Sequence, residues 1–171
     1  SKKFKSHFQP DIQVVYDFFS ANGARSMIGD RDIKIITSIA MFYDLDDPMA
    51  FMRDVRSLLA PDGIWALELS YLPLLLTQLT YDQICHEHVT YYGLAQIDWM
   101  MKRTGLKILD VSFNDVNGGS IFIMASRDDA PYQPDRGRSR EFWMPSGCWK
   151  RMDRSRGSET VSWRTARKCG I

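Results

Sequence analysis

The triplet His86-Glu87-His88 is the densest group of side chains in this sequence that could move protons. Histidine titrates near neutral pH, so an imidazole can accept a proton under physiological conditions. The intervening carboxylate could orient an imidazole or bind a substrate hydroxyl. Three nearby tyrosines could donate hydrogen bonds to an oxygen that gains negative charge: Tyr81, Tyr91 and Tyr92.

Three interpretations of the triplet are open. In the first, His88 is a general base. In the second, His86 and His88 bind a metal, but a zinc site needs three or four protein ligands and the remaining histidine, His7, is distant in sequence. In the third, these side chains are hydrogen-bonded structural polar groups in an irregular connection. Their position after a predicted strand favours a functional site, because α/β proteins place such sites at strand ends.

An alternation of strands and helices must position the triplet. Residues 33–38 are β-branched and predict a strand, residues 48–59 have helical spacing after an acidic cap, and residues 64–69 predict a second strand. This order predicts two parallel strands joined by a crossover helix. Upstream, residues 12–15 predict a short strand, and Ser20 could cap a weak helix.

Downstream of the triplet, a helix and a hairpin are predicted. Residues 94–101 have an amphipathic helical pattern that ends near Gly105. Residues 107–111 and 120–124 predict two strands, and Asn117-Gly118-Gly119 between them is suited to a hairpin connection. Residues 71–92 have no clean period. The fold class is therefore α/β.

Composition excludes several classes of protein. The chain has 171 residues, a net charge of +1 and 44% hydrophobic residues, which is typical of a globular domain without a strong field for nucleic acid or lipid. No apolar run could span a bilayer, no secretory signal is apparent, and three widely spaced cysteines indicate no disulfide framework. We therefore expect a cytoplasmic protein.

Residues 128–171 differ from the rest of the chain. They are rich in arginine and tryptophan without helical or strand period. A nucleic-acid-binding arm is disfavoured, since no fold motif for nucleic acid accompanies it. We expect a disordered or non-native tail after a domain at residues 1–127.

Residues 1–127 resemble the class I S-adenosylmethionine-dependent C-methyltransferases of nucleotide deoxysugars. The resemblance is carried by Tyr81-Asp82-Gln83-Ile84-Cys85-His86-Glu87-His88-Val89-Thr90-Tyr91-Tyr92, and by the segments 10–15, 17–20, 37–48, 70–73 and 113–120. A His-Glu-His triplet followed by paired tyrosines and a later Gly-Gly-Ser is a specific combination. The resemblance implies a partial Rossmann-like sheet with crossover helices.

The resemblance also implies a mechanism and a set of site residues. His88 would remove the proton next to the ketone of a keto-sugar nucleotide, and the enolate would attack the methyl group of S-adenosylmethionine. Glu87 would contact the sugar, and His86 has no assigned role. A tyrosine is common in the family where this chain has Cys85, which puts an oxyanion-stabilising role there in doubt. The implied cofactor contacts are Asp17, Phe18 and Ser38, and the implied substrate contacts are Tyr43, Asp44, Tyr81, Tyr92, Asn117, Gly118 and Ser120.

The sequence departs from the family on the cofactor side. It has no glycine-rich turn after a first strand, and Gly23 and Gly29 are the first glycines. We therefore expect an internal fragment of such an enzyme, with weak or no binding of S-adenosylmethionine. The alternative is an inactive remnant or binding module that needs a partner for the missing strands. The expected small-molecule partner is a nucleotide sugar, with neither membrane nor nucleic acid; the oligomeric state is left open.

Overall fold

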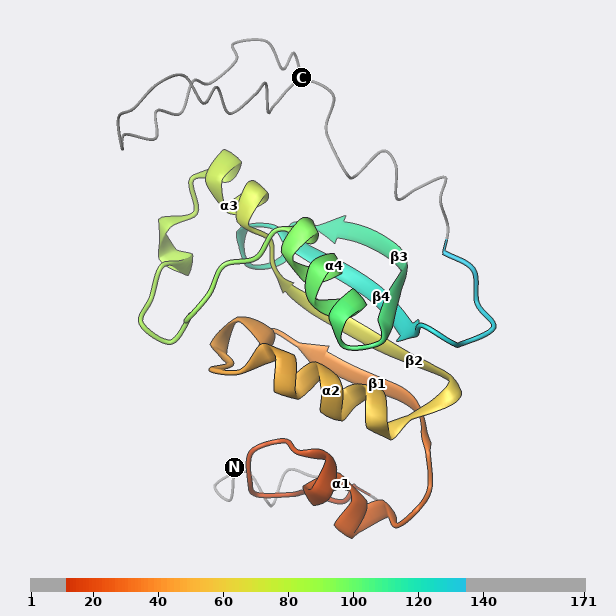
Figure 1. The fold of residues 1–171 in the computed structure, drawn as a ribbon. Helices are drawn as coiled ribbons and strands as arrows, with labels where there is room; N and C mark the ends of the chain where they lie inside the picture. Colours follow the sequence, from red (N-terminus) through yellow and green to blue (C-terminus); the bar gives the residue numbers. More distant parts are fainter. Residues whose placement is uncertain (1–11, 135–171) are drawn as a thin grey trace, which may run out of the picture. The chain divides into compact units, whose positions relative to one another are not determined.

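The computed structural model describes residues 12–134, and these form the predicted α/β fold. The strands are β1 (Ile33–Ile39), β2 (Leu59–Ser70), β3 (Leu106–Asn114) and β4 (Ser120–Arg127). They make one sheet in the order β1-β2-β4-β3 (Figure 1). β1 and β2 run parallel, as predicted, and β4 is antiparallel to both of its neighbours.

The crossover helix between the parallel strands is α2 (Pro48–Leu58). The Asp47 carboxylate accepts a hydrogen bond from the Ala50 amide at 2.8 Å, and Pro48 occupies the first turn, where its missing N–H costs nothing. The Pro-Asp-Gly sequence at residues 61–63, which is typical of a turn, lies inside β2. Residues 60–63 of β2 stand opposite the single residue Lys34 of β1 there, since Ile33 pairs with Leu59 and Ile35 with Ile64. The turn-forming residues therefore make a bulge in the strand rather than an interruption.

The second helix on the sheet is α4 (Leu94–Arg103), which precedes β3 and ends just before Gly105, as predicted. Gly105 has φ of +72°, in the left-handed region that commonly follows a helix. The hairpin between β3 and β4 is also confirmed, with a short 3-10 helix, η4 (Val116–Gly118), in its connection.

The hydrophobic core lies between α2, α4 and one face of the sheet. Trp65 and Leu67 of β2 and Ile121 and Ile123 of β4 are fully buried there, together with Met101 of α4. Along β2 the alternate residues Ile64, Ala66 and Glu68 point to the other face and are only half-buried. On β1, which forms one edge of the described sheet, Ile35 and Ile39 are exposed.

One prediction was wrong. Residues 12–15 are not a strand, because β propensity alone makes no strand where none of the described strands pairs with the segment. Residues 71–92, for which the sequence shows no clean period, begin with the helix α3 (Leu72–Gln78), which has Pro73 in its first turn. The weak helix capped by Ser20 is confirmed as α1 (Ala21–Ile28), with the Ser20 hydroxyl accepting from the Gly23 amide at 3.1 Å.

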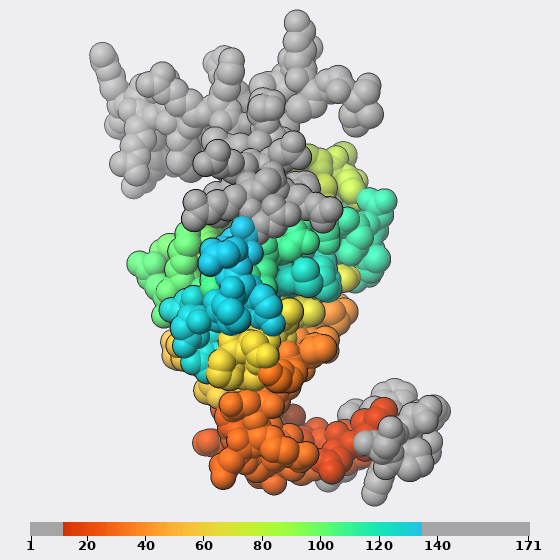
Figure 2. Space-filling view, turned by 90° about the vertical axis from the view of Figure 1, so that its right-hand side faces the viewer, coloured from red at the N-terminus to blue at the C-terminus, as the bar shows by residue number. Residues whose placement is uncertain are grey.

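The segment after β4 crosses the end of the sheet opposite the carboxyl ends of β1 and β2. The Tyr132 hydroxyl donates to the Asp62 carbonyl at 2.8 Å, and the Lys107 ammonium donates to the Ala130 carbonyl at 2.7 Å. Figure 2 faces this end and shows residues up to 134 in blue directly above the yellow start of β2. The rest of the predicted tail, residues 135–171, lies outside the described residues. Among residues 12–134, no helix has the length and apolar character needed to cross a membrane.

Candidate functional site

The candidate site lies where the parallel strands end. β1 runs into a short 3-10 helix, η2 (Phe42–Asp44), and β2 runs into α3. Ser70, the last residue of β2, pairs with Ser120, the first residue of β4, so the hairpin connection reaches the same edge. Figure 1 shows the long loop after α3, drawn in yellow-green, projecting from this edge. Open α/β sheets place their ligands at the carboxyl ends of the strands.

His88 is held on this loop by a hydrogen bond to main chain. Its Nδ1 atom lies 2.8 Å from the Gln83 carbonyl oxygen. A carbonyl can only accept, so in this geometry Nδ1 carries the hydrogen. The neutral imidazole then has its unprotonated lone pair on Nε2. The structure therefore assigns the tautomer in which Nε2 can take a proton.

Two tyrosines flank the His88 ring. The Tyr43 ring centroid is 4.2 Å from that of His88, and the Tyr91 ring centroid is 6.1 Å from it. The Tyr91 hydroxyl donates to the same Gln83 carbonyl at 3.1 Å. The Thr90 amide donates to the Tyr43 carbonyl at 3.2 Å, which ties the loop to η2. The imidazole is thus fixed on two sides.

The buried tyrosines keep their protons. Burial raises the pKa of Tyr43, the nearby Asp44 carboxylate adds to the rise, and a hydrogen bond with Ser70 opposes it. Burial likewise raises the pKa of Tyr92, against a hydrogen bond with Thr90. The Tyr43 phenol beside His88 is therefore a neutral hydrogen-bonding group at working pH.

His86 and Glu87 face solvent. Their side chains are 91% and 61% exposed, and His86 Nε2 lies 3.3 Å from Glu87 Oε1. In residues 12–134 no set of three or more His, Cys, Asp or Glu side chains is arranged to hold a metal ion. Only His88 of the triplet is therefore positioned by the rest of the site.

The predicted substrate residues divide into exposed and packed ones. Asp44 is exposed and Tyr81 is 71% exposed, both at the strand-end edge. Tyr92 is buried with its ring 5.4 Å from that of Phe42, and the buried Ser120 hydroxyl donates to the Val116 carbonyl at 2.9 Å. The side chains of Tyr92 and Ser120 thus hold the walls of the site together.

The hairpin connection packs closely against α3. Asn117 has φ of +53°, a left-handed conformation that asparagine tolerates. A Cβ atom on Gly118 would collide with the Thr80 side chain, and one on Gly119 would lie 2.6 Å from Leu74 Cβ. The glycines let this connection approach the start of the loop that carries His88.

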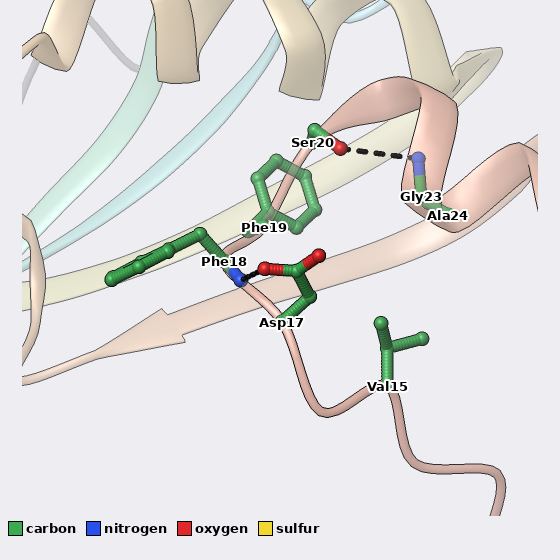
Figure 3. Close-up of a pocket in the computed structure, with 7 residues that line it drawn as sticks. All are labelled: Val15, Asp17, Phe18, Phe19, Ser20, Gly23 and Ala24. Atoms are coloured by element: carbon green, nitrogen blue, oxygen red, sulfur yellow. Dashed lines mark hydrogen bonds between the residues drawn. The ribbon is translucent and has the colours of Figure 1, made fainter.

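The predicted cofactor residues lie at the N-terminal side of the described chain. Asp17 and Phe18 line an open hollow beside α1, together with Val15, Phe19, Ser20, Gly23 and Ala24 (Figure 3). The Asp17 carboxylate accepts from the Phe18 amide at 2.8 Å, and the Phe18 side chain is 95% exposed. An exposed aromatic face and a carboxylate are groups that could stack on and hydrogen-bond a purine.

Ser38 is directed into the core. Its hydroxyl oxygen accepts a hydrogen bond from the Trp65 indole N–H at 3.0 Å, and both side chains are buried. A cofactor contact by Ser38 stays a prediction.

Two members of the site had no role in the sequence-based prediction. Gln83 accepts hydrogen bonds from both His88 and Tyr91 through its carbonyl, and Ser70 donates to the Gln83 side-chain oxygen at 3.3 Å. A main-chain carbonyl has no sequence signature. The position of Ser70 at the end of a predicted strand was the one available signal.

Known proteins provide an independent comparison. A family described as a methyltransferase domain matches residues 3–111. The C-methyltransferase NovU of Streptomyces niveus is 36% identical over 92 residues, covering 54% of this chain and 22% of NovU, so the chain spans about a fifth of that relative.

Solved structures with a similar arrangement include magnesium protoporphyrin IX methyltransferase (ChlM) from Synechocystis PCC 6803 with bound SAH, at 13% identity, a TM-score of 0.45 and coverage of 62% of this chain and 57% of that one. The pyocyanin biosynthetic protein PhzM is 16% identical, with a TM-score of 0.45 and coverage of 56% and 31%. Because the family match extends over more than half of the residues, this chain belongs to the methyltransferase domain family.

Proposed function

We propose that this chain carries the substrate side of an S-adenosylmethionine-dependent C-methyltransferase that acts on a keto-sugar nucleotide. The observation that carries the proposal is the hydrogen bond between His88 Nδ1 and the Gln83 carbonyl, which leaves Nε2 as a base. The family membership supports methyl transfer, and the similarity to a C-methyltransferase supports carbon as the acceptor.

Carbon methylation explains why a base is needed. A C–H bond next to a ketone is not nucleophilic until its proton is removed. His88 Nε2 would take that proton, the electron pair would form an enolate, and the enolate carbon would bond to the methyl group. S-adenosylmethionine supplies that methyl group on a sulfonium, which leaves as a neutral thioether, and the imidazolium returns its proton to solvent.

The other residues at this edge would orient the substrate. Tyr43 fixes the plane of the imidazole and, as a neutral phenol, adds no negative charge next to the enolate. The exposed Glu87 carboxylate is accessible to sugar hydroxyls. Asp17 and Phe18 are the residues that would hold the adenine, through the carboxylate and the exposed ring.

The test is methyl transfer from labelled S-adenosylmethionine to keto-sugar nucleotides. It is run with the 171-residue chain and with a chimaera in which residues 12–127 replace the matching part of NovU. His88→Asn can retain a donor near the Nδ1 position but has no Nε2 base, so we expect its turnover to fall by roughly 10²–10⁴-fold. His86→Asn makes the same change in an exposed imidazole and should have a much smaller effect.

The outcome also distinguishes a methyltransferase from the alternative raised by the sequence, an inactive remnant or binding module. Binding of the nucleotide sugar without methyl transfer in the chimaera would favour the binding module. Transfer at the normal rate by His88→Asn would remove His88 as the base.

A further inference from the structure

We propose that Gln83 is a positioning residue that links the His88 imidazole to the carboxyl end of β2. Its main chain would set the tautomer of His88, and its side chain would hold that main chain in place. The importance of this tautomer for catalysis rests on the proposed function, whereas the positioning itself does not.

The main-chain part of the link is a shared acceptor. The Gln83 carbonyl lies 2.8 Å from His88 Nδ1 and 3.1 Å from the Tyr91 hydroxyl. Gln83 closes the short 3-10 helix η3 (Tyr81–Gln83), and its amide donates to the Thr80 carbonyl at 3.2 Å. Two donors from later in the loop therefore converge on one peptide group, and the direction of that carbonyl decides which imidazole nitrogen carries the hydrogen.

The side-chain part of the link reaches the sheet. The Ser70 hydroxyl donates to Gln83 Oε1 at 3.3 Å. Ser70 is 6% exposed and is paired with Ser120, so its position is set by the β2–β4 ladder. The side-chain amide of Gln83 thus connects the loop to Ser70, whose position is fixed by the sheet.

Tyr43 supports the other side of the imidazole. Its ring lies 4.2 Å from the His88 ring, and its carbonyl accepts a hydrogen bond from the Thr90 amide at 3.2 Å. The imidazole therefore lies between the Gln83 carbonyl, which receives its Nδ1–H, and the Tyr43 ring.

The neighbours of Gln83 offer the loop little other support. Tyr81 and Ile84 are 71% and 68% exposed, and Cys85 is also exposed. Apolar burial is therefore small on both sides of Gln83, and hydrogen bonds must supply much of the local order. A simpler explanation is that the Gln83 side chain forms hydrogen bonds without affecting His88. In that case, replacing Gln83 would leave His88 in place, whereas our proposal predicts that its tautomer changes.

The experiment measures the tautomer of His88 in the 171-residue chain by imidazole nitrogen NMR, at a pH where the ring is neutral. The chain has three histidines, and the His88→Asn spectrum identifies the signals of His88. We compare Gln83→Ala and Ser70→Ala, which break the same hydrogen bond from opposite ends, with Gln78→Ala, an exposed glutamine at the end of α3. Far-UV circular dichroism confirms that each variant is folded.

In the unaltered chain we expect the Nδ1–H tautomer to dominate. Gln83→Ala and Ser70→Ala should each lower the ratio of Nδ1–H to Nε2–H by about two- to tenfold, the range set by one neutral hydrogen bond. The double variant should lower it by less than the sum of the two single effects, because both changes remove the hydrogen bond between Ser70 and Gln83. Gln78→Ala should leave the ratio unchanged.

An Nε2–H tautomer in the unaltered chain would overturn the proposal, as would an unchanged ratio in folded Ser70→Ala or Gln83→Ala. If Gln83→Ala does not fold, Ser70→Ala alone decides, since it removes one buried oxygen and little volume. The readout needs no methyl donor. If the tautomer ratios are as expected but no methyl transfer occurs, the proposed function alone is refuted. If methyl transfer occurs but the ratio does not change in the folded variants, the positioning role alone is refuted.

Discussion

Replacing Ser38 by alanine tests whether this residue serves the core. The change removes the oxygen that accepts the Trp65 indole hydrogen bond at 3.0 Å. Trp65 is fully buried and its indole nitrogen can only donate, so the N–H would lose its partner without gaining water. An unpaired buried donor costs about 1–3 kcal/mol.

The assay is urea unfolding followed by far-UV circular dichroism. For a denaturant slope of about 2 kcal/mol/M, this cost lowers the unfolding midpoint by about 0.5–1.5 M. Trp65→Phe removes the donor instead. The double variant should lose less free energy of unfolding than the sum of the two single variants, because they break the same hydrogen bond.

One result would refute this reasoning. If the free energy of unfolding of Ser38→Ala lies within about 0.3 kcal/mol of that of the unaltered chain, the hydrogen bond to Trp65 does not stabilise the core. Weaker binding of S-adenosylmethionine with unchanged stability would then support the cofactor contact that the sequence predicts.

Three further predictions concern the elements around the site. Gly119→Ala should destabilise the chain more than Gly29→Ala by about 1–3 kcal/mol in urea unfolding. Both glycines have positive φ, but only the new Cβ at Gly119 meets Leu74. Equal losses of stability would contradict the close packing of the hairpin on α3. Asp47→Ala should cost about 0.5–2 kcal/mol by removing the cap of α2, whereas Asp46→Ala should cost little, and the same titration compares them. Burial raises the pKa values of Tyr43, Tyr71 and Tyr92 above that of an unfolded tyrosine, so the stability they contribute is present below about pH 10 and is lost as the pH rises through their folded pKa values. The urea midpoint should therefore fall across this range, and less steeply in Tyr71→Phe. A midpoint that does not change with pH would count against buried, protonated phenols.

The parallel β1-α2-β2 unit could be predicted because several local signals agree. A β-branched run marks β1, and Asp47 and Pro48 mark the start of α2. α3 was missed because Leu72–Gln78 is apolar on most sides and has no capping side-chain hydrogen bond, so periodicity does not identify it. Residues 12–15 were wrongly predicted as a strand because a strand needs a neighbour, and propensity says nothing of neighbours.

The candidate site was predictable in its residue types and not in its geometry. His88 stood out because histidine titrates near neutral pH and lies after a strand. Its tautomer depends on the Gln83 carbonyl, and the direction of a carbonyl depends on backbone angles that the sequence does not display. Similarly, nothing in the sequence distinguishes a Ser38 hydroxyl that faces a ligand from one that faces Trp65.

The central claim is that His88 removes a proton next to a ketone, and solvent exchange measures that step directly. A keto-sugar nucleotide is incubated in D2O with S-adenosylhomocysteine and the chimaera that carries residues 12–127. Deuterium uptake at the carbon next to the ketone is followed by NMR. We predict exchange at one carbon with the unaltered sequence and a rate at least about 100-fold lower with His88→Asn. Equal exchange rates in the two proteins would contradict the account.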